Sequence, residues 1–182
     1  EHIEFYSLKS LKFLFEKNGL EIFKIEENDI NGGSYRIYCR KFNKGSIKLK
    51  NENVLKLMKD FIDRVEKNKM ATVNFVNKKI KKGKKIYLYG ASTKGNTVLQ
   101  YYGLNYKKIP FGAERSPEKW GKHTIGTGIK IITEKMARKL NPDYFFVTPW
   151  GFIKEFVKRE KKWLKKGGTF IVPFPKLRLI KF

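Results

Sequence analysis

From residue 84 onward, short apolar strands alternate with helical patterns, and no other feature of the sequence constrains the fold as much. The expected strands are 85–90, 108–114, 128–133, 143–149 and 168–175, and the expected helices are 95–103, 133–141 and 151–167. Strands that alternate with helices of this length form βαβ units and a mostly parallel sheet. We therefore expect an α/β fold, with a Rossmann-like open sheet flanked by helices.

The first 41 residues follow a different pattern. A helix is expected over 7–18, because Ser7 is a good N-cap and Gly19 a good terminator. Two alternating segments, 20–27 and 35–41, then predict an antiparallel strand pair around a turn. This piece has too little apolar surface to fold alone. We expect it to be the end of an upstream domain.

A polar, basic stretch at 42–50 is expected to be a linker, and a long helix is expected over 51–82. No Pro or Gly interrupts the helical stretch. Its apolar positions recur three or four residues apart, at Val54, Met58, Phe61, Val65, Thr72 and Val76. Such a helix either bridges domains or packs one face on the sheet that follows.

The charge of the chain is strongly positive. Of 182 residues, 41 are Lys or Arg and 17 are Asp or Glu, which gives a net charge of +24. This charge would attract nucleic acid, an anionic membrane or an anionic substrate. The lysines, however, occur throughout the chain and no nucleic-acid-binding motif accompanies them. We expect neither a nucleic-acid nor a membrane partner.

Other features concern the cellular setting. One cysteine, Cys39, excludes a disulfide framework and a cysteine-based metal site. Neither a run of about 18 apolar residues nor a secretory signal is visible, so a cytoplasmic protein is expected. The sequence lacks an initial Met, and we expect it to be a segment of a longer protein.

The run YLYGASTKGNT, residues 87–97, has the pattern of a strand, a tight turn and a helix N-terminus. Backbone N–H groups at such a turn can bind an anion. The run matches neither the dinucleotide-binding fingerprint nor the P-loop. A phosphate site and a plain turn both remain open. The candidate binding residues are Gly90, Ser92, Thr93, Lys94, Gly95, Asn96 and Thr97.

Several further residues are candidates for weaker reasons. Glu114 ends a strand, where a carboxylate can accept a ribose hydroxyl. Trp150 also follows a strand and could stack on a base or pack in the core. His123 is expected in a surface loop, and Gly32 and Gly33 in a turn. No cluster of His, Cys and carboxylates has metal-ligand spacing, so no metal is expected in this segment.

Together these segments resemble one protein family. The runs EHIEFYSLKSLKFLFEKNGLEIF, GGSYRIY, YGASTKGNTVLQYYGL, ERSPEKWGKHTIGTGIKI, NPDYFFVTPWGFIKEFVKRE and GGTFIVPFP occur in the family's order. The chain resembles the C-terminal part of S-adenosylmethionine-dependent sugar C-methyltransferases. These enzymes methylate nucleotide-linked deoxy-keto-sugars on carbon. The resemblance extends over essentially the whole chain.

The resemblance implies a domain organisation. Residues 1–41 would be the tail of the methyltransferase domain, 42–50 a linker, and 51–182 the Rossmann-like C-terminal domain. S-adenosylmethionine and zinc would bind to upstream domains, so this segment alone should bind neither and should be inactive. The implied partners are a nucleotide-diphosphate sugar and the upstream methyltransferase domain of the same chain.

The resemblance also implies roles for individual residues. The family carries a Tyr-x-Glu-His run whose His is the proposed general base, and Glu1 and His2 match its last two positions. The run 90–97 would hold the nucleotide-sugar near its diphosphate, with Lys94 as the charged contact. Glu114, Arg115 and Trp150 would also contact the substrate.

Some positions depart from the family pattern. The family commonly has Asp-Arg-Asn-Pro where this chain has Glu114, Arg115, Ser116 and Pro117. The sugar and nucleotide preferences therefore stay open. Two other functions remain as alternatives. One is a non-catalytic scaffold or homodimerisation domain that makes contact through the helix at 51–82, and the other is a basic nucleic-acid-binding module.

Overall fold

The computed structural model describes residues 4–30, 33–49 and 53–182. The predictions for Glu1, His2 and Gly32 lie outside the described residues. The chain forms two compact units, residues 1–56 and 57–182.

The described part of unit 1 contains one α-helix and one strand pair. Helix α1 (Leu8–Lys17) begins at Ser7, whose Oγ accepts a hydrogen bond from the Ser10 N–H at 3.1 Å. Strand β1 (Leu20–Asn28) pairs antiparallel with β2 (Ser34–Lys41), with a register shift between Ile22 and Lys24. The predicted helix and antiparallel pair are confirmed.

The segment that follows β2 folds back onto β1. The buried Glu21 carboxylate accepts backbone N–H groups of Asn43 at 2.9 Å and Lys44 at 2.7 Å, and also that of Gly45. Arg40 Nε donates to the same carboxylate at 2.6 Å. Successive N–H groups in a turn form a concave site for an anion. These bonds hold the pKa of Glu21 at about 2, with the Asn43 N–H as the largest cause.

Unit 2 is built on a six-stranded sheet. Its order is β5-β4-β3-β6-β7-β8, and only β8 runs antiparallel to its neighbour. The strands are β3 (Ile86–Tyr89), β4 (Phe111–Glu114), β5 (Lys130–Thr133), β6 (Tyr144–Val147), β7 (Thr169–Val172) and β8 (Arg178–Ile180). The predicted open, mostly parallel α/β sheet is confirmed. The antiparallel edge strand β8 was not predicted.

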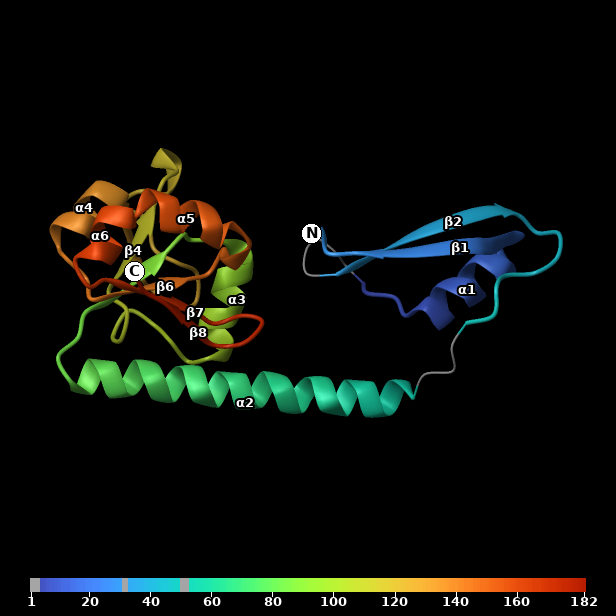
Figure 1. Cartoon of the computed structure of the whole chain (residues 1–182), viewed down its shortest axis with the longest axis horizontal. Coiled ribbons are helices and arrows are strands. Elements are labelled where there is room, and N and C mark those ends of the chain that lie inside the picture. The colour runs from blue at the N-terminus through green and yellow to red at the C-terminus, as the bar shows by residue number, and fades with distance from the viewer. Residues whose placement is uncertain (1–3, 31–32, 50–52) are drawn as a thin grey trace. The chain divides into compact units, whose positions relative to one another are not determined.

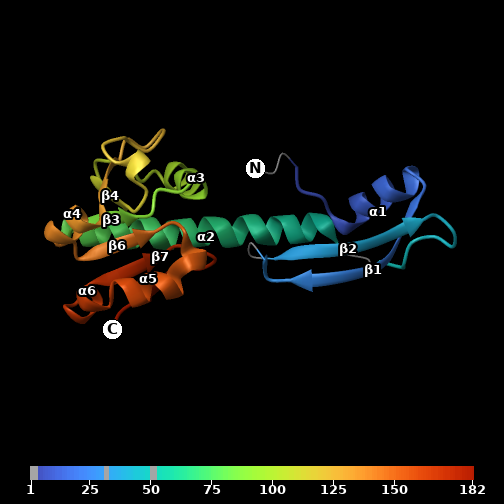
Figure 2. The same cartoon turned by 90° about the horizontal axis from the view of Figure 1, so that it is seen from above.

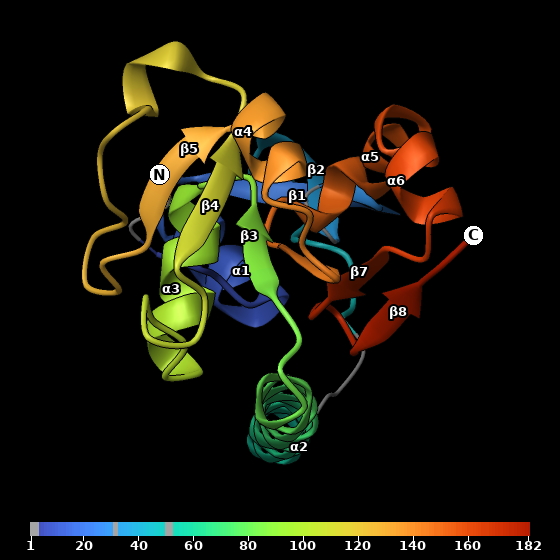
Figure 3. The same ribbon diagram turned by 90° about the vertical axis from the view of Figure 1, so that its left-hand side faces the viewer.

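Helices cover both faces of this sheet (Figure 3). Tyr87 and Tyr89 face one core with α4, α5 and α6, while Ile86 and Leu88 face the other core with α2 and α3. The helices are α2 (Val54–Lys81), α3 (Thr93–Tyr101), α4 (Glu134–Lys139), α5 (Ile153–Arg159) and α6 (Lys161–Lys165). Short 3-10 turns, η2 (Pro117–Lys119) and η3 (Trp150–Phe152), complete the unit.

The helix predicted over 151–167 is interrupted, and that prediction is corrected. It consists of η3, α5 and α6, and the break between α5 and α6 lies at Glu160. Glu160 has φ −97° and ψ 18°, outside helical geometry, and its side chain is buried. A carboxylate drawn into the interior for its hydrogen bonds displaces the backbone from the regular helix.

Helix α2 packs along only part of its length. Its buried residues, Asn68, Thr72 and Val76, all lie in its second half. In the first half, Leu57, Met58, Phe61 and Ile62 are each more than half exposed. Figures 1 and 2 show this half extending beyond the sheet of unit 2. The predicted apolar face thus meets the sheet in its second half alone.

Candidate functional site

The sheet of unit 2 has a topological switch point between the adjacent strands β3 and β6. The chain leaves β3 toward β4 on one side, and it leaves β6 toward β7 on the other. In open α/β sheets, ligands bind outside the carboxyl ends of the strands at such a point. A ligand-binding site is therefore expected at the loops after β3, β4 and β6.

A cavity of about 320 Å³ lies at this edge of the sheet. We call it the carboxyl-edge cavity. Its lining residues come from the β3–α3 turn, the loop after β4, the start of α4 and the segment of η3 and α5. They are Tyr89, Gly90, Ala91, Ser92, Ala113, Glu114, Arg115, Lys119, Glu134, Pro149, Phe152, Glu155, Phe156 and Arg159.

Two glycines of the turn are required by close packing. A Cβ on Gly90, which has a φ of +82°, would collide with the Pro149 ring, and one on Gly95 would collide with the Thr148 side chain. Thr148 Oγ1 also donates a hydrogen bond to the Gly90 carbonyl at 2.5 Å. The loop after β6 therefore lies directly against the turn, and these glycines have a structural reason to be there.

The N-terminus of α3 is capped within the turn itself. Ser92 Oγ accepts the Gly95 N–H at 3.0 Å, which satisfies one of the free donors of the first helical turn. Of the predicted turn residues, Gly90 and Ser92 line the carboxyl-edge cavity. The residues from Thr93 to Thr97, Lys94 included, are not among its lining residues. A role for Lys94 stays a prediction.

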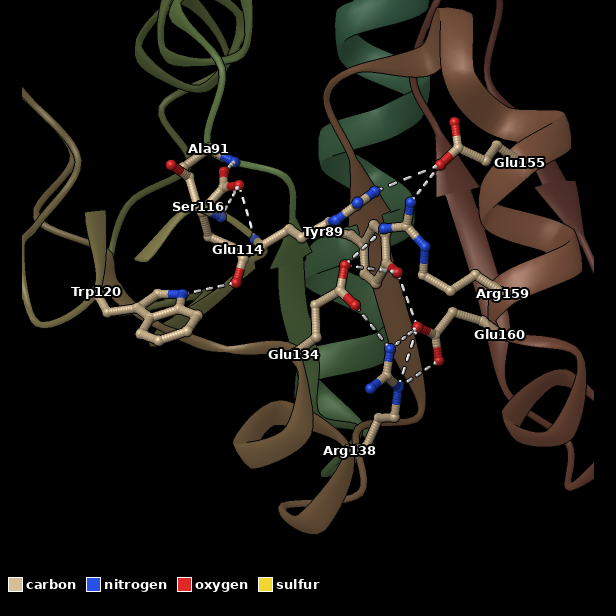
Figure 4. A network of polar contacts seen from close by, with 11 residues as sticks. Tyr89, Ala91, Glu114, Ser116, Trp120, Glu134, Arg138, Glu155, Arg159 and Glu160 are labelled. Atoms are coloured by element: carbon tan, nitrogen blue, oxygen red, sulfur yellow. Dashed lines mark hydrogen bonds and ion pairs between the residues drawn. The ribbon is translucent and has the colours of Figure 1, made fainter. Parts of the chain in front are cut away.

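Glu114 ties the end of β4 to the turn (Figure 4). Its Oε2 accepts the Ala91 N–H at 2.8 Å, and its Oε1 accepts the N–H groups of Arg115 at 2.8 Å and Ser116 at 3.1 Å. Burial alone would raise the pKa of Glu114, but these bonds and the charge of Lys119 outweigh it and lower that pKa. The carboxylate predicted to accept a ribose hydroxyl thus already binds three backbone groups.

Lys119 and its neighbour Trp120 reinforce this arrangement. Lys119 Nζ donates to the Ala91 carbonyl at 3.1 Å and lies 3.7 Å from the Glu114 carboxylate. Trp120 Nε1 donates to the Glu114 carbonyl at 2.9 Å. The loop after β4 is therefore fixed beside the cavity, with the Lys119 charge at its edge.

A buried ionic network that the sequence reading missed borders the same cavity (Figure 4). The Tyr89 hydroxyl lies 2.8 Å from Glu160 and 3.2 Å from Glu134. Arg138 Nε donates to both oxygens of Glu160, at 2.9 and 3.1 Å, and its Nη2 donates to Glu134 at 2.8 Å. Burial, together with the charge of Glu160, raises the pKa of Tyr89. Tyr89 is thus a neutral hydrogen-bonding group here.

Arg159 connects this network to the cavity mouth. Its Nη1 donates to Glu134 at 2.7 Å and its Nη2 donates to Glu155. Glu155 also lies 3.9 Å from Arg115. Two pairs, Glu134 with Arg138 and Glu155 with Arg159, are four residues apart on a helix, a spacing visible in the sequence. Their convergence on Tyr89 depends on the tertiary fold.

Trp150 and His123 lie away from this cluster. The Trp150 ring stacks on Phe174, with a centroid distance of 5.1 Å and an interplanar angle of 29°, and packs against both cores. His123 is exposed in the loop before β5, where its backbone forms an isolated antiparallel β-bridge with Lys130. Neither residue lines the carboxyl-edge cavity.

Within residues 4–30, 33–49 and 53–182, no group of three or more His, Cys, Asp or Glu side chains is arranged to hold a metal ion. None of the helices in the described part of the chain is both long and apolar enough to span a bilayer.

Comparisons with known proteins give the family. Residues 29–175 match the model of the C-methyltransferase C-terminal domain. Over 192 residues the chain is 30% identical to C-methyltransferase NovU of Streptomyces niveus, an alignment that covers 99% of this chain and 46% of NovU. The chain thus spans somewhat less than half the length of that relative. Because the family model covers most of the sequence, the chain belongs to the family of C-methyltransferase C-terminal domains.

Proposed function

We propose that this chain is the C-terminal portion of an S-adenosylmethionine-dependent C-methyltransferase that acts on a nucleotide-linked keto-deoxysugar. Its part in the reaction is to help bind the nucleotide-sugar at the carboxyl edge of its sheet. The observation that carries this proposal is the carboxyl-edge cavity, which lies at the switch point and is lined by cations, carboxylates and two phenylalanines. The membership of the chain in a C-methyltransferase family gives the class of reaction.

The family resemblance implies two further bound groups, the methyl donor S-adenosylmethionine and zinc. The loop after β3, where a Rossmann-type sheet holds a nucleotide cofactor, lies directly against Thr148 and Pro149. The described residues also contain no group of ligands suited to a metal. We propose that both bind to portions of the protein outside this chain and that this chain alone does not turn over.

The proposed catalytic step in this chain belongs to His2, with Glu1 beside it. A carbon next to a ketone is weakly acidic, and a neutral imidazole can take its proton near pH 7, which leaves an enolate on the sugar. This role follows from the resemblance of the first residues to the active-site run of the family. Both residues lie outside the described part of the chain.

Calorimetric titration of the 182-residue chain tests the binding role. A thymidine diphosphate-sugar and a short DNA duplex are titrated separately at near-physiological salt, and the free sugar serves as the control ligand. We expect saturable binding of the nucleotide-sugar and none of the free sugar. If only DNA binds, with an affinity that falls steeply as the salt concentration rises, the positive charge of the chain serves to bind nucleic acid and the proposed role is wrong.

The exposed half of α2 supports a second candidate, a docking or dimerisation role. Leu57, Met58, Phe61 and Ile62 leave a contiguous apolar face uncovered, and such a face marks an interaction surface. Equilibrium sedimentation over a range of concentrations tests this role. A mass that rises with concentration and returns to the monomer value in Phe61→Ser would support it, and a constant monomer mass would exclude self-association.

A further inference from the structure

We propose that the carboxyl-edge cavity binds a diphosphate between Arg115, Lys119 and Arg159, in the position that the Glu155 carboxylate occupies in this structure. The inference rests on the proposed function, which identifies the natural ligand as a nucleotide-diphosphate sugar. It differs from the sequence-based prediction, which placed the anion on Lys94.

The three cations come from separate segments and meet at one cavity. Arg115 follows β4, Lys119 ends η2 and Arg159 ends α5, and all three line the cavity. Among the described residues, they are the only Lys or Arg side chains that do so. Arg presents its donors in a planar fork that matches a phosphate, and Lys adds a point charge. The set therefore has the chemistry for a doubly charged phosphate group.

Glu155 is the replaceable carboxylate of this cluster. It binds Arg159 and lies 3.9 Å from Arg115, while 54% of its side chain is exposed. The side chains of Glu134 and Glu160 are 15% and 1% exposed, and buried hydrogen bonds hold them. An ion pair as open to solvent as that of Glu155 contributes little stability. A ligand phosphate can take its place while the buried network stays intact.

The charges of the lining support the same exchange. The lining holds three cations and three carboxylates, Glu114, Glu134 and Glu155. With all of them in place the cavity is formally neutral, and the Glu155 carboxylate occupies the arginines that a second anion would need. When Glu155 turns outward, the remaining lining carries a net positive charge. Glu114 adds little repulsion, because three backbone N–H groups already bind its carboxylate.

Calorimetry with inorganic pyrophosphate and with thymidine diphosphate tests this site in the 182-residue chain. Arg115→Ala is the main variant, because 75% of the Arg115 side chain is exposed and its loss should not disturb the fold. We expect it to weaken both ligands roughly tenfold, the effect of one lost charge-assisted hydrogen bond. Arg159→Lys keeps the charge and loses the fork, and it should weaken binding less.

Glu155→Gln gives the more decisive result, because the expected change is a gain. Removing the competing carboxylate should tighten pyrophosphate binding by about two- to fivefold, as the loss of one exposed ion pair would allow. A misfolded variant cannot produce this gain. Glu118→Gln is the matched control, since it removes an exposed carboxylate from the adjacent loop without touching the cavity lining.

Two further controls separate the site from diffuse positive charge. Arg178→Ala removes an exposed arginine on β8, and Lys94→Ala removes the cation predicted from the sequence. Both should change the affinity by less than about twofold, because a charge far from the site is screened and acts on the ligand only weakly. Equal losses in Arg178→Ala and Arg115→Ala, or a loss confined to Lys94→Ala, would overturn the proposal.

The outcomes also distinguish this proposal from the proposed function. If the nucleotide-sugar binds but Arg115→Ala and Glu155→Gln leave its affinity unchanged, the substrate-binding role stands and the site is wrong. If pyrophosphate responds to both variants but the nucleotide-sugar does not bind, the anion site stands and the proposed role fails. If the wild-type chain binds no pyrophosphate, the site is overturned.

Discussion

Two buried glutamates, one in each unit, are held in opposite ways. Glu21 is satisfied mainly by the backbone N–H groups of one short loop, with Arg40 as its single side-chain partner. Glu160 is satisfied by the side chains of Arg138 and Tyr89, which come from α4 and β3. The first carboxylate fixes a local loop, whereas the second connects elements far apart in the sequence. A substitution at Glu160 should therefore lower the stability of the whole of unit 2.

Glu160→Gln is expected to give the largest effect. Removing the Glu160 charge leaves Arg138 with Glu134 as its carboxylate partner. Because Arg138 keeps that partner and is partly exposed, we expect a loss of about 3 kcal/mol, the low end for the breaking of a buried pair. All three tryptophans, Trp120, Trp150 and Trp163, lie in unit 2. Urea unfolding followed by tryptophan fluorescence therefore measures this unit. A change below about 1 kcal/mol would mean that the network does not hold unit 2 together.

Gly95→Ala is expected to come next, because it strains the packing on which the turn depends. The added methyl group would collide with Thr148, and overpacking of this kind costs about 1–3 kcal/mol. Gly151→Ala is the matched control, since a Cβ there meets nothing within 4 Å. The same fluorescence measurement applies. Equal stability of the two variants would show that the loop after β6 moves aside freely.

Glu21→Gln should act on unit 1 and leave unit 2 unchanged. The variant weakens the acceptor for the N–H groups of Asn43, Lys44 and Gly45. Hydrogen exchange at these three amides should become faster, while the tryptophan-detected stability stays the same. Glu26→Gln, on the same strand but more exposed, is the control. Unchanged exchange at the three amides would mean that the loop holds its place without the charge.

Unit 1 should also respond to pH through Glu21. The pKa of Glu21 is about 2 in the folded chain against an ordinary value of 4.5. A carboxyl with a lowered pKa stabilises the fold fully above its ordinary pKa, and the contribution is lost as the pH falls through the folded value. The protection of the amides of residues 43–45, measured against the intrinsic exchange rate at each pH, should therefore fall from about pH 4.5 toward pH 2. This fall should be weaker in Glu21→Gln.

Glu155→Ala is expected to have the smallest effect on stability. Its ion pairs are exposed, and such pairs contribute about 0–1 kcal/mol. The stability of unit 2 should change by less than about 0.5 kcal/mol, in contrast to Glu160→Gln. A loss as large as that of Glu160→Gln would show that Glu155 is part of the structural network and is not replaceable.

The sequence predicted those parts of the fold that local patterns decide. The βαβ alternation, the N-cap at Ser7 and the turn before α3 all depend on residues close together in the chain. Strand β8 was missed because three residues at a sheet edge leave no clear period. The break at Glu160 was missed because the helical pattern runs through it, and only the tertiary contact with Arg138 explains it.

The candidate site was predicted only in part for the same reason. Gly90, Ser92, Glu114 and Arg115 follow strand ends, a position that sequence reasoning can recognise, and all four line the cavity. Arg159 ends a helix 44 positions after Arg115 in the chain. It reaches the same cavity because β6 pairs with β3 on the side opposite β4. No local pattern gives that strand order.

The loop that binds Glu21 also decides where this protein can be divided for expression. A protein cut after Lys41 would lose the Asn43, Lys44 and Gly45 amides and retain a buried carboxylate with Arg40 as its remaining partner. A cloning boundary after unit 1 should therefore lie beyond Ile47, whose N–H still bonds to β1 at the Ile22 carbonyl. A boundary at 41 would separate an anion from its solvating groups and yield an aggregation-prone product.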